Sequence, residues 1–182
     1  MGGDTVNGLR QRLREITENG LVDSHRQLIE ELRLLYDHSI RVVTSAAPIA
    51  RYTCAMYAFG FEEDKEYEAI VLASPAPVYA STGFVQRLID RGTLRKLDVP
   101  ESEALVVYRL NGALTHIGKM LSLERIESKW GIGHLYRHAL LEVPAQYGDE
   151  MEFFDAIDVD TALDELSIFA REFGVRFKDD AP

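Results

Sequence analysis

The chain has 182 residues, of which 46% are hydrophobic and 27% are charged, as is typical of a folded protein with one substantial core. Lys and Arg number 20 and Asp and Glu number 30, so the formal net charge is −10. An acidic surface repels phosphate backbones and no local basic patch offsets it, which argues against a nucleic-acid partner. No apolar run approaches the ~20 residues that span a bilayer, which argues against a membrane partner.

The N-terminal residues lack the positive and apolar regions of a secretory signal. We therefore expect a cytoplasmic protein, or one that is exported by a route without a cleavable signal. The single cysteine, Cys54, excludes an internal disulfide and any zinc site built from several cysteines.

Residues 1–45 are predicted to be helical. Leu9, Leu13 and Ile16 recur at helical spacing, and a helix is expected to end at Asn19-Gly20. A second helix is indicated by Ser24 and Gln27 at capping-box spacing. We expect this segment to be an N-terminal helical arm that packs on residues 46–182 or contacts a protein partner.

The remaining chain changes from helical to strand patterns and back. Helices are predicted over residues 52–60 and 84–89, and strands over residues 105–108, 114–120, 125–130 and 149–154. Asn111-Gly112 between the first two strands predicts a β-hairpin. A last helix carries one apolar face made of Ala162, Leu163, Leu166, Phe169, Ala170 and Phe173. Helices, a cluster of strands and a final helix favour an α+β fold with a central antiparallel sheet.

Cys54 and His116 are the residues best suited to chemistry. A thiol becomes a strong nucleophile where a helix N-terminus or an imidazolium stabilises its anion, and Cys54 is expected near a helix start. His116 lies on the second strand of the hairpin, a rigid element that can hold an imidazole. Glu127 or Ser128 on the next strand would orient the ring. Strand alternation places Ser128 on the face of Ile126 and turns Glu127 away.

This part of the chain resembles the hairpin of the NlpC-like cysteine peptidases of the papain-like superfamily, and is similar to poorly characterised bacterial papain-like domains. The segments that carry the resemblance are Leu105-Val106-Val107-Tyr108, Asn111-Gly112, Thr115-His116-Ile117-Gly118 and Arg125-Ile126-Glu127-Ser128. The family places a third catalytic polar residue about a dozen positions after the histidine, which points to Ser128. The resemblance implies a papain-like domain over residues 46–182 and a thiol hydrolase that acts on a peptide or peptidoglycan-stem amide without a cofactor or metal.

Two alternatives to this assignment remain open. The family's nucleophile stands in an Asp-Cys-Ser-Gly motif, and the segment here most similar to that motif is Ser81-Thr82-Gly83. If Ser81 held the position of the nucleophile, Cys54 would be structural. The family's third residue is usually a histidine, for which His138 is the candidate. We favour Cys54, because its separation of 62 positions from His116 leaves room for the intervening elements.

Other residues carry weaker predictions. Trp130 and Tyr52 are candidates for lining a substrate cleft, although a lone strand tryptophan is more often part of a core. His134 and His138 have the spacing of metal ligands on a helix but are expected in a surface loop. Asp158 and its acidic neighbours are expected to cap the last helix.

A rival hypothesis is a catalytically inactive papain-like binding domain in a bacterial toxin, immunity or defence system. It predicts a buried, unreactive Cys54, and Glu127 and Ser128 side chains that do not contact His116. A further alternative is an α+β domain of unrelated fold.

Overall fold

The computed structural model describes residues 3–74 and 78–177. Within these residues lies a seven-stranded antiparallel sheet with the order β1-β6-β5-β4-β3-β7-β2. The strands are β1 Arg41–Val43, β2 Lys96–Leu97, β3 Leu105–Leu110, β4 Ala113–Ser122, β5 Arg125–Lys129, β6 Leu135–His138 and β7 Glu150–Phe154. The helices are α1 Gly3–Asn19, α2 Val22–Glu31, α3 Cys54–Phe59, α4 Lys65–Ala73, α5 Thr82–Asp90 and α6 Val159–Glu172, with short 3-10 helices η1 Leu32–Leu34, η2 Ile49–Arg51 and η3 Ala145–Tyr147. The α+β class predicted from the sequence is confirmed.

The predicted hairpin is formed by β3 and β4. Asn111 and Gly112 have φ values of 53° and 77°, the positive values that a type I′ turn requires at both central positions. The two strands pair Tyr108 with His116. β5 pairs with β4 on its other side, so residues 127 and 128 lie on the strand next to that of His116.

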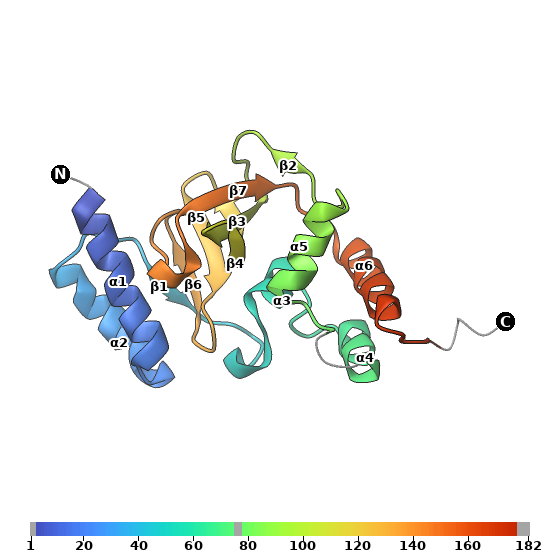
Figure 1. The fold of residues 1–182 in the computed structure, drawn as a ribbon. Helices are drawn as coiled ribbons and strands as arrows, with labels where there is room; N and C mark the ends of the chain where they lie inside the picture. The colour runs from blue at the N-terminus through green and yellow to red at the C-terminus, as the bar shows by residue number, and fades with distance from the viewer. Residues whose placement is uncertain (1–2, 75–77, 178–182) are drawn as a thin grey trace.

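The sheet separates two hydrophobic cores, because successive side chains of a strand point to opposite faces. In β3, Val106 and Tyr108 belong to the core under α1 and α2, whereas Leu105 and Val107 belong to the core under α3, α5 and α6. Figure 1 shows α1 and α2 on one side of the sheet and the other helices on the opposite side. The fold therefore has three layers.

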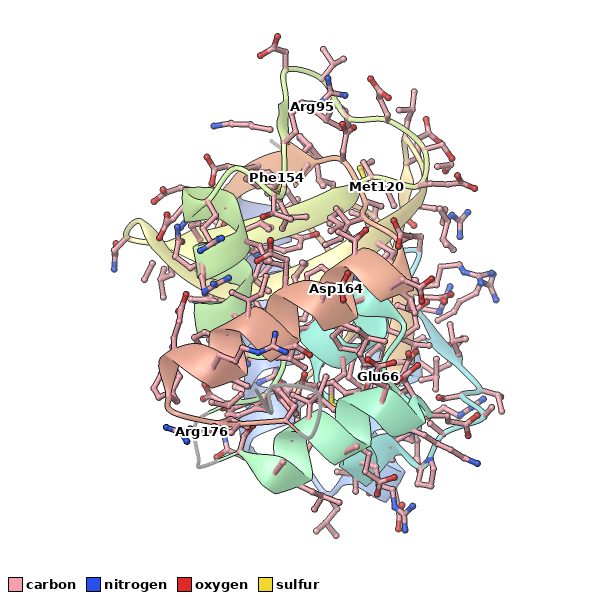
Figure 2. All side chains as sticks on the ribbon, turned by 90° about the vertical axis from the view of Figure 1, so that its right-hand side faces the viewer. Glu66, Arg95, Met120, Phe154, Asp164 and Arg176 are labelled. Carbon is pink, nitrogen blue, oxygen red and sulfur yellow. The ribbon has the colours of Figure 1, made fainter. Side chains whose placement is uncertain are left out.

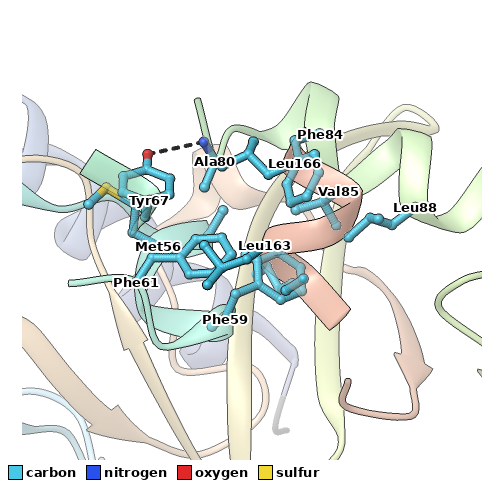
Figure 3. Packing of buried hydrophobic residues seen from close by; sticks show 14 of the residues in the cluster. Met56, Phe59, Phe61, Tyr67, Ala80, Phe84, Val85, Leu88, Leu163 and Leu166 are labelled. Carbon is cyan, nitrogen blue, oxygen red and sulfur yellow. Dashed lines mark hydrogen bonds between the residues drawn. The ribbon is translucent and has the colours of Figure 1, made fainter. Parts of the chain in front are cut away.

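The core under α3, α5 and α6 is built around aromatic and branched side chains (Figure 3). The rings of Phe59 in α3 and Phe84 in α5 meet edge to face with centroids 5.7 Å apart. Leu163 and Leu166 of α6 are buried against them. Burying each such side chain contributes about 1.5–3 kcal/mol, so this core fixes α3 against the sheet.

The last helix has the boundaries and cap that its sequence predicts. Asp158 accepts a hydrogen bond from the backbone N–H of Thr161 at 2.8 Å, and Gly174 follows the helix with a φ of 84°. Figure 2 shows α6 crossing in front of the sheet, with Asp164 on its exposed side.

The segment expected to be an N-terminal arm packs on the sheet. Leu9 and Leu13 of α1 and Ile29 of α2 share a core with Trp130, which directly follows β5, and β1 joins the sheet beside β6. Among the described residues, no helix is long and apolar enough to cross a bilayer.

Candidate functional site

Cys54 is the first residue of α3, where the sequence predicts a helix start. Thr53 caps this helix by accepting a hydrogen bond from the Met56 N–H at 3.1 Å, and its hydroxyl donates to the Ala80 carbonyl at 2.9 Å. Gly60 ends the helix with a φ of 77°. Hydrogen bonds at the start and core packing along its length therefore fix the position of the thiol.

His116 is held on β4 by a stacking contact rather than by a polar one. Its ring lies against the ring of Tyr147 of η3, with centroids 3.9 Å apart and planes 6° apart. The side chain is 1% exposed, and its Nε2 atom has no hydrogen-bond partner in the described part of the chain. A buried polar atom without a partner is costly, and in a cavity wall it is available to a ligand.

Cys54 and His116 line the same cavity, which has a volume of about 380 Å³. Its wall combines the segment that leads into α3, the start of β4, the loop after β5 and η3. The lining residues are Ile49, Ala50, Arg51, Tyr52, Thr53, Cys54, Thr115, His116, Gly131, Ile132 and Tyr147. The structure thus brings the two predicted catalytic residues to one cavity without a hydrogen bond between Sγ and Nε2.

Burial keeps both groups neutral near pH 7. It raises the pKa of the Cys54 thiol, against the opposite effects of backbone hydrogen bonds, the first from Ile117, and of the Lys129 charge. Burial also lowers the pKa of His116 well below its usual value, and the charges of His138 and Lys129 lower it further. In the free protein Cys54 is therefore a neutral thiol and His116 a neutral imidazole. Cys54 becomes a nucleophile only when the thiol proton is removed.

Glu127 is directed away from His116, as strand alternation predicts. Its carboxylate accepts hydrogen bonds from the Tyr57 hydroxyl and from Arg137, whose Nη2 lies 2.7 Å away. It lines a separate cavity of about 520 Å³, which Tyr57 also lines. The expectation that Glu127 orients His116 is wrong for this geometry, because both of its oxygens are engaged elsewhere.

Ser128 also has other partners than His116. Its hydroxyl lies 2.8 Å from Nε2 of His138 and accepts a hydrogen bond from Nε1 of Trp130 at 3.0 Å. His138 is fully buried in β6, and its Nδ1 lies 2.8 Å from the Ala139 carbonyl, so the expected surface loop at this position is wrong. The two candidates for third catalytic residue, Ser128 and His138, contact each other.

The two predicted substrate-binding residues have different places. Tyr52 lines the cavity, and its hydroxyl has no hydrogen-bond partner among the described residues. Trp130 does not line it: the indole is fully buried and stacks on Tyr136 at 4.1 Å, which corrects the prediction. Ser81, the alternative nucleophile, caps α5 by accepting a hydrogen bond from the Phe84 N–H at 3.3 Å.

Two residues of this region, Tyr147 and Lys129, are absent from the sequence-based prediction. Tyr147 lies in a three-residue 3-10 helix, and no periodic pattern marks its contact with His116. Lys129 is 0% exposed, although a lysine at the end of a strand is usually solvated. Its Nζ donates to the Gly131 carbonyl at 2.6 Å and lies 5.2 Å from the centre of the Tyr52 ring. Strand alternation could have placed Lys129 on the same face of the sheet as Glu127, toward α3. It could not have predicted that Lys129 is buried.

No group of three or more His, Cys, Asp or Glu side chains in residues 3–74 and 78–177 is arranged to hold a metal ion. The spacing of His134 and His138 does not produce a metal site, since His134 contacts the Val22 carbonyl and His138 contacts Ser128.

No protein-family model matches the chain, and neither the curated proteins nor the solved structures include a significant match.

Proposed function

We propose that the protein is a thiol-dependent hydrolase of papain-like, NlpC-like architecture that cleaves an amide bond. The observation that carries this proposal is the cavity lined by Cys54, at the start of a helix, and by His116, whose buried Nε2 has no partner. A thiol and an imidazole that face one cavity are the minimum for covalent acyl transfer. The antiparallel hairpin beneath the helix supports the architecture.

In the proposed reaction, Cys54 attacks the substrate carbonyl while its proton passes to His116. The tetrahedral intermediate then collapses, the C–N bond breaks, and His116 gives the proton to the leaving amine. The lowered pKa of His116 favours this second transfer, because a weakly basic imidazole is a strong proton donor once charged. Water attacks the resulting thioester, releases the acid and restores the thiol.

Tyr147 supplies the orientation that a third polar residue gives in related mechanisms. A ring stacked at 3.9 Å prevents the imidazole from tilting and still permits proton transfer in its plane. The Thr115 hydroxyl donates to the Tyr147 carbonyl at 2.5 Å, which ties η3 to β4. The substrate class we propose is a peptide-like amide, including peptidoglycan-stem peptides.

The proposal is tested with a peptide-based electrophile and a panel of peptide amides. The parent protein should form a mass-shifted adduct on Cys54 and release amine from at least one amide. Cys54→Ser and His116→Gln should each lower the hydrolysis rate at least about 100-fold. Glu127→Gln is the matched control and should retain the rate. Equal hydrolysis by the parent and Cys54→Ser would overturn the proposal.

The alternative function is a non-catalytic papain-like domain that binds a protein partner. It is favoured by the raised pKa of the Cys54 thiol and by the engagement of Glu127 and Ser128 away from His116. It predicts slow alkylation of Cys54 that His116→Gln does not change, with no amide hydrolysis.

A further inference from the structure

Lys129 is a buried cation without an anionic side-chain partner. Its side chain is 0% exposed, and its Nζ donates a hydrogen bond to the Gly131 carbonyl. In the described residues, no carboxylate forms an ion pair with it, and Glu127 on the same face is bound by Tyr57 and Arg137 instead. Burying an ammonium without an anion is strongly unfavourable, so this position calls for a compensating negative charge.

The group that can supply this charge is the thiol of Cys54. α3 packs on β4 and β5, and Lys129 lies on the β5 face toward it. Gly131 and Tyr52, the two residues that Lys129 contacts, line the same cavity as Cys54. Lys129 itself does not line the cavity, so it can act on the thiol but not touch a substrate.

We propose that Lys129 is a positioning residue whose ammonium is the counter-charge of the Cys54 thiolate whenever the thiol loses its proton, while His116 stays neutral in the free protein. This inference rests on the proposed function for its consequence in catalysis, but the pairing itself needs no substrate. The S–H bond of Cys54 breaks, its proton goes to water in the free protein or to Nε2 of His116 in the proposed reaction, and no other bond changes. The resulting thiolate and the existing ammonium together have no net charge.

The titration properties of the neighbouring groups agree with this arrangement. Burial lowers the pKa of Lys129 to about 8, and interaction with Cys54 opposes that change, so the ammonium is the main form at pH 7. The other titratable groups near it are Tyr52 before α3, His116 on β4 and His134 before β6. The Lys129 charge lowers the pKa of both histidines, which leaves the thiolate as the form it stabilises.

The main experiment measures the pH dependence of Cys54 alkylation by iodoacetamide, together with thiolate absorbance at 240 nm and Cys54→Ser as the blank. Lys129→Met, an uncharged side chain of similar length, should raise the midpoint by at least about one pH unit, so that alkylation at pH 7.5 slows about tenfold. Lys129→Arg should restore the parent midpoint. His116→Gln should leave it nearly unchanged. An unchanged midpoint in folded Lys129→Met would overturn the inference.

A second measurement needs no substitution and covers the case in which Lys129→Met does not fold. The Lys129 side chain is titrated by NMR in the parent, with Cys54 free or blocked as a neutral methyl disulfide. Because coupled groups affect each other reciprocally, blocking the thiol should lower the pKa of Lys129. An unchanged pKa would overturn the pairing. If the coupling between Lys129 and Cys54 is present but no amide is hydrolysed, the proposed function is rejected and the pairing is not.

Discussion

The imidazole of His116 and the phenol of Tyr147 are stacked nearly in parallel, with ring centroids 3.9 Å apart. His116 lies on β4 in the middle of the sheet, and Tyr147 lies in a short 3-10 helix that precedes β7, the neighbour of the edge strand β2. Their contact therefore links the cavity wall to a connection between strands. In this molecule an aromatic contact does what a hydrogen bond from Glu127 or Ser128 was expected to do.

Loss of this stack should destabilise the protein and disturb the site. Tyr147→Ala should lower the free energy of unfolding by about 3–5 kcal/mol, because it leaves a cavity beside a buried ring. Tyr147→Phe keeps the stack and should cost about 1 kcal/mol. Urea denaturation at pH 7.5 measures both. Equal costs for the two variants would show that the stack is not what matters at this position.

Ser128 is expected to be structural. Ser128→Ala removes the partner of the Trp130 N–H and of His138 Nε2, both in the buried interior. Each buried group left without a partner costs about 1–3 kcal/mol, so the free energy of unfolding should fall by about that amount or more. The alkylation rate of Cys54 should stay within twofold of the parent.

The control for this substitution is Ser122→Ala, at an exposed position of β4, which should leave stability nearly unchanged. If Ser128→Ala slowed amide hydrolysis as strongly as His116→Gln does, Ser128 would regain the orienting role predicted from its spacing.

Local signals in the sequence predicted the elements that carry the site. The Asn111-Gly112 turn, the start of α3 at Cys54 and the cap at Asp158 each depend on residues close in the chain. One local prediction was wrong: Ser24 does not cap α2, which begins at Val22 after an N-cap at Leu21 without a side-chain bond.

The rest of the site depends on contacts between distant residues, which no local pattern reveals. Tyr147 reaches His116 only because β7 pairs with β3 and brings η3 beside β4. Lys129 is buried on the strand that α3 packs against, with the ring of Tyr52 near its ammonium. Alternation correctly separated Glu127 from Ser128, but could not show that both would be engaged by other side chains.

His138 should make the protein sensitive to acid. Burial lowers the pKa of His138 to about 4, whereas a histidine in an unfolded chain titrates near 6.5. Between these values the unfolded chain binds a proton that the folded chain does not. The stability that the neutral His138 ring contributes is thus complete above about pH 6.5. As the pH falls to about 4, the free energy of unfolding should decrease by on the order of 3 kcal/mol.

The measurement is urea denaturation of the parent and of His138→Gln at pH 7.5 and pH 5. The substitution should cost less at pH 5 than at pH 7.5, because only the parent must exclude a proton from a buried ring at the lower pH. A cost that is the same at both values would show that His138 does not titrate in this range.

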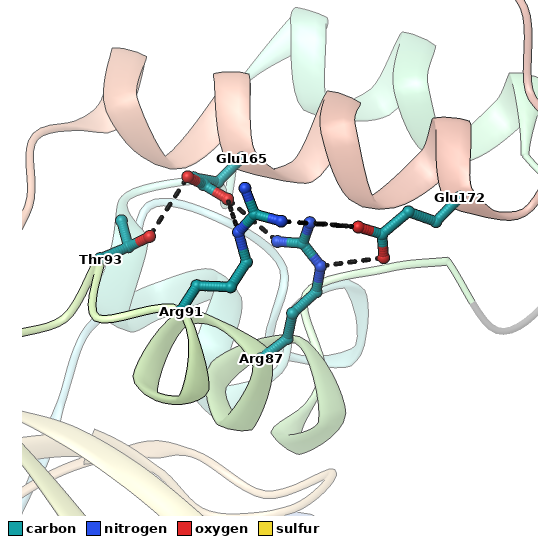
Figure 4. A network of polar contacts seen from close by, with 5 residues as sticks. All are labelled: Arg87, Arg91, Thr93, Glu165 and Glu172. Atoms are coloured by element: carbon teal, nitrogen blue, oxygen red, sulfur yellow. Dashed lines mark hydrogen bonds and ion pairs between the residues drawn. The ribbon is translucent and has the colours of Figure 1, made fainter.

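Arg87 should join α5 to α6 more strongly than its neighbour Arg91 does (Figure 4). Its side chain is 12% exposed, and its guanidinium donates to Glu165 at 2.9 Å and to Glu172 at 2.6 Å, while Thr93 donates to the other Glu165 oxygen at 3.2 Å. Arg91 is 47% exposed, and its ion-pair distances are 3.7 and 3.8 Å. Partly buried hydrogen bonds between charged groups contribute about 1.5–3 kcal/mol each, whereas exposed pairs contribute less than about 1 kcal/mol.

Arg87→Met should therefore lower the free energy of unfolding by about 2 kcal/mol, and Arg91→Met by less than about 0.5 kcal/mol. Arg87→Lys should recover only part of the loss, because an ammonium cannot make the forked contact with Glu172. Denaturation in low salt and in 0.5 M NaCl separates the two sites further, since screening acts mainly on the exposed pair. Similar costs for the two methionine variants would mean that α5 and α6 are held together by their apolar contacts alone.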